Sequence, residues 1–209
     1  AGEPVIAHHM KRFGWLWLFG ILHAYLVWYG DILVPYALAG FLIFWVRKCS
    51  PKTLTILGVI FLLIVPALMG LMALAFHLLD VTNLDQGMDE FMKTDIETFR
   101  SGWLEQMKMR PFYVLYMHLF VLPFFVFTTV VGTMLVGMAL LKSGFFEGRW
   151  QIKSYQIWVG CGVGIGIPAA TAFAIIYQLS GFNSMTQMIH ATWSFPAITL
   201  TAMGYASFL

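Results

Sequence analysis

A histidine lies within an apolar run at residues 20–33, GILHAYLVWYGDIL, and a glycine–aspartate pair closes that run. Imidazole titrates near neutral pH, so it suits general-base catalysis, and a neighbouring carboxylate can fix its tautomer and raise its basicity. On a helix wheel Gly20, His23, Gly30 and Asp31 share one face, and the glycines leave room beside the ring. We therefore take His23 as a candidate catalytic base and Asp31 as the residue that orients it.

Two interpretations of this histidine compete, and composition separates them. In a water-soluble helix bundle it would be a polar residue tolerated in the core, whereas in a membrane an ionisable side chain is costly and is a functional candidate by default. The chain has 209 residues, of which 60% are hydrophobic, 17% aromatic and 11% charged. Soluble domains carry about 25% charged residues, so a mean hydropathy of +0.79 predicts an integral membrane protein.

The apolar runs are long and continuous rather than alternating, which favours helices over strands. A helix that spans about 30 Å of hydrocarbon needs roughly 20 apolar residues. The sequence predicts an all-α, polytopic transmembrane bundle with about six spans, in one domain that covers residues 1–209. The expected spans are Phe13–Tyr29, Ile32–Val46, Leu54–Leu79, Phe112–Leu141, Tyr155–Leu179 and Ala191–Leu209. The glycines of CGVGIGIP lie inside the fifth span and are interpreted as a contact with another helix rather than as a phosphate loop.

Basic residues predict the orientation of these spans, because Lys and Arg favour the cytoplasmic side. If the spans alternate, one side receives eight of the twelve basic residues: Lys11, Arg12, Arg47, Lys48, Lys52, Lys142, Arg149 and Lys153. The N-terminus is therefore expected in the cytoplasm and residues 80–110 in the periplasm. This topology divides the domain into a three-span part at 11–79, an outer segment at 80–110 and a second three-span part at 111–209.

The outer segment 80–110 is the sizeable hydrophilic part of the chain and holds seven acidic and four basic residues. From about Asp89 to Lys108 its apolar residues recur at steps of three and four. That spacing predicts an amphipathic helix on the outer face of the membrane.

Further candidate residues also fall in the outer halves of the spans. Arg100 and Arg110 are either interfacial charges or partners of an anionic substrate group. His118 and Tyr36 either line the same cavity or serve ordinary packing and the aromatic belt. The cytoplasmic halves are mostly apolar, so the sequence predicts a polar cavity that opens outward, with these four residues as candidates for substrate binding.

Several classes of site are not indicated by the sequence. The histidines lack tight ligand spacing such as HExxH, so no metal site is predicted. No motif for haem or flavin attachment is evident, and no cofactor is expected. The net charge of +2 is too small, and the basic residues too scattered, to suggest a nucleic-acid partner.

Three blocks of the sequence resemble the YeiB-like family of bacterial inner-membrane proteins, whose C-terminal part is a domain of unknown function. The blocks are LFGILHAYLVWYGDILVPYALAG after Lys11–Phe13, DIETFRSGWLEQMKMRP, and VGTMLVGMALLKSGFFEGRW followed by GVGIGIP. The resemblance implies a multi-pass inner-membrane protein of which this chain is a fragment. It carries over His23, Gly30 and Asp31 as the motif core, with Arg100 and Arg110 as secondary positions.

More remotely, the chain is similar to transmembrane acyltransferases that modify envelope sugars and use a membrane-embedded histidine as base. This resemblance implies an acyl donor, and an envelope glycan or lipid as acceptor, as partners beside the lipid bilayer itself. Two alternatives remain open: a transporter of a small solute with an outward-facing polar cavity, and a non-catalytic membrane scaffold. The sequence leaves the oligomeric state undetermined.

Overall fold

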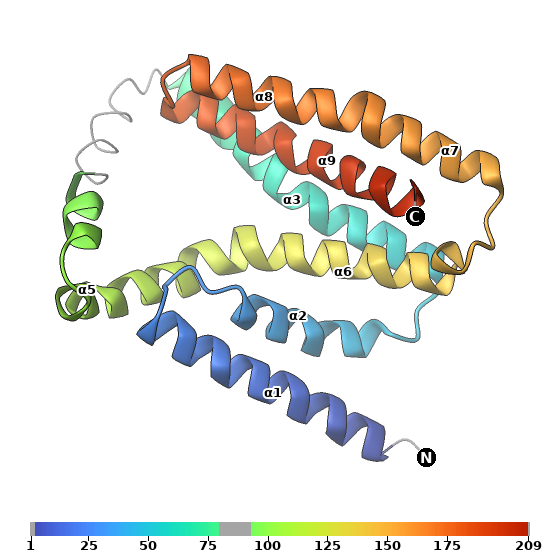
Figure 1. Ribbon diagram of the computed structural model, residues 1–209, viewed down its shortest axis with the longest axis horizontal. Helices are drawn as coiled ribbons and strands as arrows, with labels where there is room; N and C mark the ends of the chain where they lie inside the picture. Colours follow the sequence, from blue (N-terminus) through green and yellow to red (C-terminus); the bar gives the residue numbers. More distant parts are fainter. Residues whose placement is uncertain (1–2, 80–92, 209) are drawn as a thin grey trace.

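The computed structural model describes residues 3–79 and 93–208, and within these residues it contains helices and no strand (Figure 1). The predicted all-α class is therefore confirmed. The long elements lie roughly antiparallel and their connections alternate between the two ends of the molecule. The elements are α1 (Glu3–Leu26), α2 (Leu33–Val46), α3 (Pro51–Leu78), α5 (Trp103–Tyr116), η1 (Met117–Val126), α6 (Phe127–Lys142), η2 (Phe145–Glu147), α7 (Ile152–Cys161), η3 (Gly162–Gly166), α8 (Ile167–Leu179) and α9 (Ser184–Phe208).

Three helices among the described residues are long and apolar enough to cross a membrane: Pro51–Leu78, Trp103–Lys142 and Ile152–Leu179. The predicted count of about six spans is therefore not supported by the described helices. The 14 residues of α2 reach about 21 Å, less than the roughly 30 Å of a hydrocarbon layer. The other two helices, α1 and α9, are long but carry more polar side chains.

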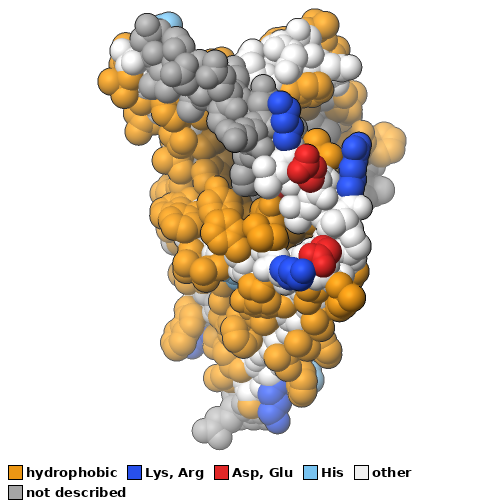
Figure 2. Space-filling model, turned by 90° about the vertical axis from the view of Figure 1, so that its left-hand side faces the viewer, with side chains coloured by type: hydrophobic (Ala, Val, Ile, Leu, Met, Phe, Trp, Pro, Cys, Tyr) orange, Lys and Arg blue, Asp and Glu red, His pale blue; other side chains and the backbone are white. Residues whose placement is uncertain are grey.

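The outer faces of the helices carry large apolar side chains. Trp15, Leu71 and Ile157, on three different helices, are 59%, 64% and 63% exposed. At the end of the molecule shown in Figure 2, hydrophobic side chains cover much of the surface, and charged ones gather on one side. A water-soluble bundle would bury these side chains, so the surface is compatible with a membrane protein and speaks against the soluble interpretation of His23.

The central packing joins α2, α3 and α6. Buried Ala39, Leu54, Val131 and Leu135 belong to one apolar cluster between these helices. Beyond this cluster α3 packs on α9, and α2 packs on α1 (Figure 1). The bundle is therefore built outward from α3 and α6, with α1 at one side and the α7–α8 helix at the other.

Two of the long helices contain π-helical turns. The helix Trp103–Lys142 widens at η1, which contains Pro123, and the helix Ile152–Leu179 widens at η3 just before Pro168. Proline lacks a backbone N–H and disturbs the regular hydrogen-bond ladder. π-helical turns absorb such disturbances and often occur at functional sites.

The predicted helix contact of the glycine-rich run is confirmed. A Cβ on Gly162 would lie 2.5 Å from the Cα of Gly204, and one on Gly166 would lie 2.5 Å from Thr201 Oγ1, so both glycines face α9. Gly160 and Gly164 have open space instead. Glycines four apart thus let α9 approach the backbone of this helix, as the spacing predicts.

The predicted amphipathic helix from Asp89 to Lys108 is wrong in its continuity. Residues 89–92 lie outside the described part of the chain, residues 93–100 are helical, and the helix ends at Arg100, before a bend at Ser101. Gly102 is extended (φ −65°, ψ 161°) and caps α5, which starts at Trp103 and continues into α6. The spacing of apolar residues continues across the break, so the pattern alone does not reveal it. Ser101 and Gly102 are residue types that end a helix easily.

Candidate functional site

His23 and Asp31 form a direct pair at the end of α1. His23 Nδ1 lies 2.8 Å from Asp31 Oδ1, and the Asp31 side chain is fully buried while the imidazole is 37% exposed. Since a carboxylate only accepts hydrogen bonds, Nδ1 carries the proton and Nε2 is the basic nitrogen. The structure thus confirms the predicted contact between these two residues.

Asp31 is held in place by α2 as well as by the histidine. Its second oxygen, Oδ2, accepts a hydrogen bond of 2.8 Å from the backbone N–H of Val34 in the first turn of α2. A carboxylate at a helix N-terminus satisfies an otherwise free N–H and is favoured by the helix dipole. Both carboxylate oxygens therefore have defined partners, which fixes the direction in which Asp31 meets the imidazole.

Gly20 makes the close approach of α1 to this turn possible. A Cβ at Gly20 would lie 2.8 Å from the backbone N of Val34 and 2.9 Å from Asp31 Oδ2. Any larger residue would push α1 away from the start of α2. Gly20 is therefore required for the contact between His23 and Asp31, and it does more than leave space beside the imidazole.

A small cavity of about 70 Å³ adjoins Asp31 and is lined by Gly30, Pro35 and His118, among others. His118 Nδ1 donates a hydrogen bond of 2.7 Å to the carbonyl of Val114, and its Nε2 is buried without a partner among the described residues. A water molecule needs roughly 10–15 Å³ of such space and two or more polar partners. The cavity therefore has room for water between Asp31 and the second histidine.

Arg110 is also buried, being only 4% exposed. Its Nη2 donates to Gln106 Oε1 at 3.1 Å, whereas Nη1 has no partner among the residues that the structure describes. Arg110 does not line the small cavity. A buried guanidinium with a free N–H can bind an anion, but no hydrogen bond joins Arg110 to His23 or Asp31 among the described residues.

The remaining two candidates lie away from the pair. Arg100 is exposed in the helical stretch 93–100, and Tyr36 is 42% exposed on α2. Neither lines the small cavity. The structure thus brings Asp31 together with His23 and His118 and leaves Arg100 and Tyr36 outside this group. The periodicity of an apolar helix does not identify its packed face, so sequence could not place Tyr36.

A group of aromatic residues adjoins the site through Tyr29, which lines the small cavity, and it was missed by sequence reasoning. The rings of Tyr29, Phe99 and Tyr113 lie 5.3–5.9 Å apart, and the Tyr113 hydroxyl bonds Asp95. The sequence signal is the position of these aromatic residues close to predicted loops. Tyr29 comes just before Asp31, Phe99 lies within the segment 80–110, and Tyr113 follows it.

The end of α1 is tied to α5 through one side chain. Trp103 Nε1 donates a hydrogen bond of 3.2 Å to the carbonyl of Leu26, the last residue of α1. Carbonyls in the last turn of a helix lack intrahelical partners, so the indole satisfies one of them. This contact positions the turn of α1 that carries His23.

The predicted polar cavity that opens outward has a different form. Beside Asp31 the structure has a small cavity of about 70 Å³, while a cavity of about 400 Å³ lies at the opposite end, between α3, α6, α7 and α9. In the described part of the chain, no group of three or more His, Cys, Asp or Glu side chains could hold a metal ion.

The fold and this site together define an all-helical protein with apolar helices that could cross a membrane. No family model and no solved structure matches the chain. Over 58 residues the chain is 47% identical to the uncharacterized protein YxaH of Bacillus subtilis (strain 168). The match covers 28% of this chain and only 14% of the length of YxaH. The resemblance to the YeiB-like family is tested by neither finding and stays a prediction.

Proposed function

We propose that this chain is part of a multi-pass protein of the bacterial inner membrane and crosses the bilayer six times. The antiparallel helices support this proposal, since the basic loops 47–52 and 143–153 fall at the same end of the molecule (Figure 1). That end faces the cytoplasm, because Lys and Arg are retained there. His23, Asp31 and the segment 80–110 then belong to the periplasmic half.

Within that frame, His23 acts as the general base of an acyl transfer. Its Nε2 takes a proton from a hydroxyl or amine of an envelope glycan or lipid, and the oxygen or nitrogen attacks the carbonyl carbon of an acyl thioester or acyl lipid. The new ester or amide bond forms, the bond to the leaving thiolate or alkoxide breaks, and His23 returns the proton to the leaving group. Asp31 stabilises the imidazolium that forms between these steps.

The observation that carries this proposal is the His23–Asp31 pair. A buried carboxylate bonds Nδ1 at 2.8 Å and is itself fixed by Val34, which leaves Nε2 as the base. A histidine with only a packing role needs neither a buried acid nor a half-exposed ring. Arg110, with its unpaired Nη1, is a subsidiary candidate for an anionic part of the substrate.

The test compares bacteria that express the wild type, His23→Gln and Asp31→Asn, with envelope glycans and lipids analysed by mass spectrometry. Acylated species produced by the wild type should fall at least a hundredfold with His23→Gln, because general-base catalysis contributes about 10²–10⁴-fold. The control is His77→Gln, which changes an exposed histidine on α3. If His23→Gln and His77→Gln leave the same acylated species unchanged, the catalytic role is wrong.

One observation favours transport of a small solute as a second function. Two of the long helices contain π-helical turns, at η1 and η3, and interrupted helices are common where transporters bind and move their solutes. Purified protein in proteoliposomes with an imposed proton gradient would then move a solute. A scaffold role remains a third proposal, and cross-linking from residues 93–108 would identify its partner.

A further inference from the structure

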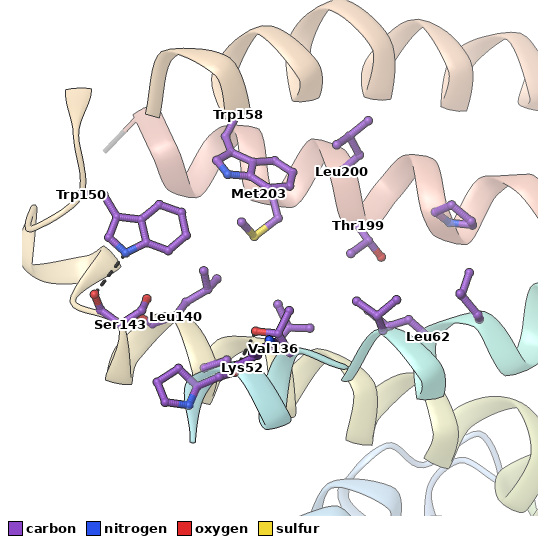
Figure 3. A pocket seen from close by; sticks show the side chains of 16 residues that line it. Lys52, Leu62, Val136, Leu140, Ser143, Trp150, Trp158, Thr199, Leu200 and Met203 are labelled. Atoms are coloured by element: carbon purple, nitrogen blue, oxygen red, sulfur yellow. Dashed lines mark hydrogen bonds between the residues drawn. The ribbon is translucent and has the colours of Figure 1, made fainter. Parts of the chain in front are cut away.

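The cavity of about 400 Å³ at the inner end of the bundle lies far from His23 and has no part in the proposed acyl transfer. It is partly open, and side chains from α7 and α9 face side chains from α3 and α6 across it (Figure 3). Trp150 closes one end, where its indole donates a hydrogen bond of 3.1 Å to the carbonyl of Ser143. Its volume is in the range of small-molecule sites.

The wall of this cavity behaves as an apolar surface. The hydroxyls of Thr55, Ser143 and Thr199 line it, but each donates to a backbone carbonyl of its own helix or helix end at 2.8–3.0 Å. The Trp150 N–H is also satisfied. Among the polar groups that line the cavity, the Lys52 ammonium and the Trp158 indole N–H lack a hydrogen-bond or ion-pair partner in the described part of the chain, and of these two only Lys52 carries a charge.

The surroundings of Lys52 are strongly basic. The only acidic residue in the neighbouring loop, Glu147, is paired with Arg149 at 2.6 Å. Lys142 donates to the carbonyls of the loop after α2 and is thereby engaged. Lys52 is exposed at the first turn of α3. Its positive charge has no partner among the described residues and is therefore free to pair with an anion at the mouth of the cavity.

The length of the cavity matches one leaflet of a bilayer. Lys52 lies at its mouth and Leu63 lines it deeper along α3, and this stretch of helix is roughly 16 Å long. The hydrocarbon layer of a membrane is about 30 Å thick, so the slot extends through about half of it. Tryptophan at the mouth is typical of the headgroup level.

We propose that this cavity binds one acyl chain of an anionic phospholipid from the inner leaflet, with the lipid phosphate paired to Lys52. The apolar wall takes the chain and the single free cation takes the headgroup. The inference rests on the proposed membrane location and orientation but not on acyl transfer. It is therefore separable from the role of His23.

Native mass spectrometry of the purified chain, with equal amounts of phosphatidylglycerol and phosphatidylcholine added in detergent, tests the headgroup. One phosphatidylglycerol should be retained in preference to phosphatidylcholine. Lys52→Gln should lower that preference about fivefold, as expected for one cation near an anionic lipid. The matched control is Lys48→Gln, which removes an exposed lysine from the loop just before α3, and Lys48 does not line the cavity.

A second pair of variants tests the chain-binding slot. Thr199→Phe places a ring in the cavity and should abolish retention of both lipids, whereas Ile198→Phe adjoins it on an exposed face of the same helix and should not. Equal retention in both variants, or equal effects of Lys52→Gln and Lys48→Gln, would overturn the proposal. His23→Gln should leave lipid retention unchanged, so a failed acyl transfer is distinguishable from a failed lipid site.

Discussion

At the scale of single residues, Asp31 links three parts of the chain. It bonds His23 on α1, caps the first turn of α2 through Val34, and lines a small cavity that His118 also lines. A side chain that only capped α2 would not need a histidine partner. The same carboxylate therefore contributes to the fold and to the chemistry that we propose.

Gly20 should be the residue most sensitive to a single added methyl group near the pair. Gly20→Ala would place a Cβ 2.8 Å from the backbone N of Val34, so we expect it to lower the free energy of unfolding by about 1–3 kcal/mol, as overpacking does. Thermal unfolding in detergent micelles measures this loss.

The matched control is Gly14→Ala on the same helix, where a Cβ meets nothing within 4 Å. It should leave stability unchanged or raise it by up to about 1 kcal/mol, because alanine favours a helix over glycine. Equal behaviour of the two variants would show that α1 does not approach α2 as closely as the structure has it.

At the scale of elements, close crossings of small residues join the helices. Gly58 on α3 faces Gly132 on α6, and Gly162 faces Gly204 on α9. In lipid the hydrophobic effect does not drive helices together, so such contacts between backbones are a principal source of association. One π-helical segment, η3, contains Gly162, and the other, η1, contains His118.

Gly162→Ala should separate α7 from α9. Its Cβ would lie 2.5 Å from a backbone atom that cannot move without its helix, so we expect a loss of about 1–3 kcal/mol in unfolding free energy. Gly160→Ala, whose Cβ meets open space, should not be destabilising. Unfolding of both variants by a denaturing detergent, followed by circular dichroism, would contradict this contact if they unfolded alike.

The sequence predicts the location of most helices, but it predicts less of how the residues of the candidate site are arranged. Long apolar runs suffice to locate helices, and His23 and Asp31 are near enough in the chain for one turn to join them. The break at Gly102 is not evident because the apolar period continues across it. The positions of Tyr36 and His118 depend on which face of each helix packs, which is decided by partners far away in the sequence.

At the scale of the whole molecule, the basic loops and the proposed site lie at opposite ends of the bundle (Figure 1). This separation is what the proposed six-pass topology requires. Under the proposed topology, the small cavity beside Asp31 would lie in the outer half of the membrane and the apolar cavity beside Lys52 in the inner half.

Thiol labelling in intact bacteria tests this topology. In a chain with Cys49→Ser and Cys161→Ser, a membrane-impermeant maleimide should label Glu97→Cys but not Lys153→Cys. Both positions are exposed, so both should react once the membrane is opened, which is the control for reactivity. Labelling of Lys153→Cys in intact cells would reverse the orientation.

The indole of Trp103 has a mechanical consequence for the molecule as a whole. It donates a hydrogen bond to the carbonyl of Leu26, which lies less than one helical turn after His23. A substrate that bound at this end and displaced the indole would free the end of α1 and allow the imidazole of His23 to move. Binding at this end of the molecule would then change the position of the proposed base.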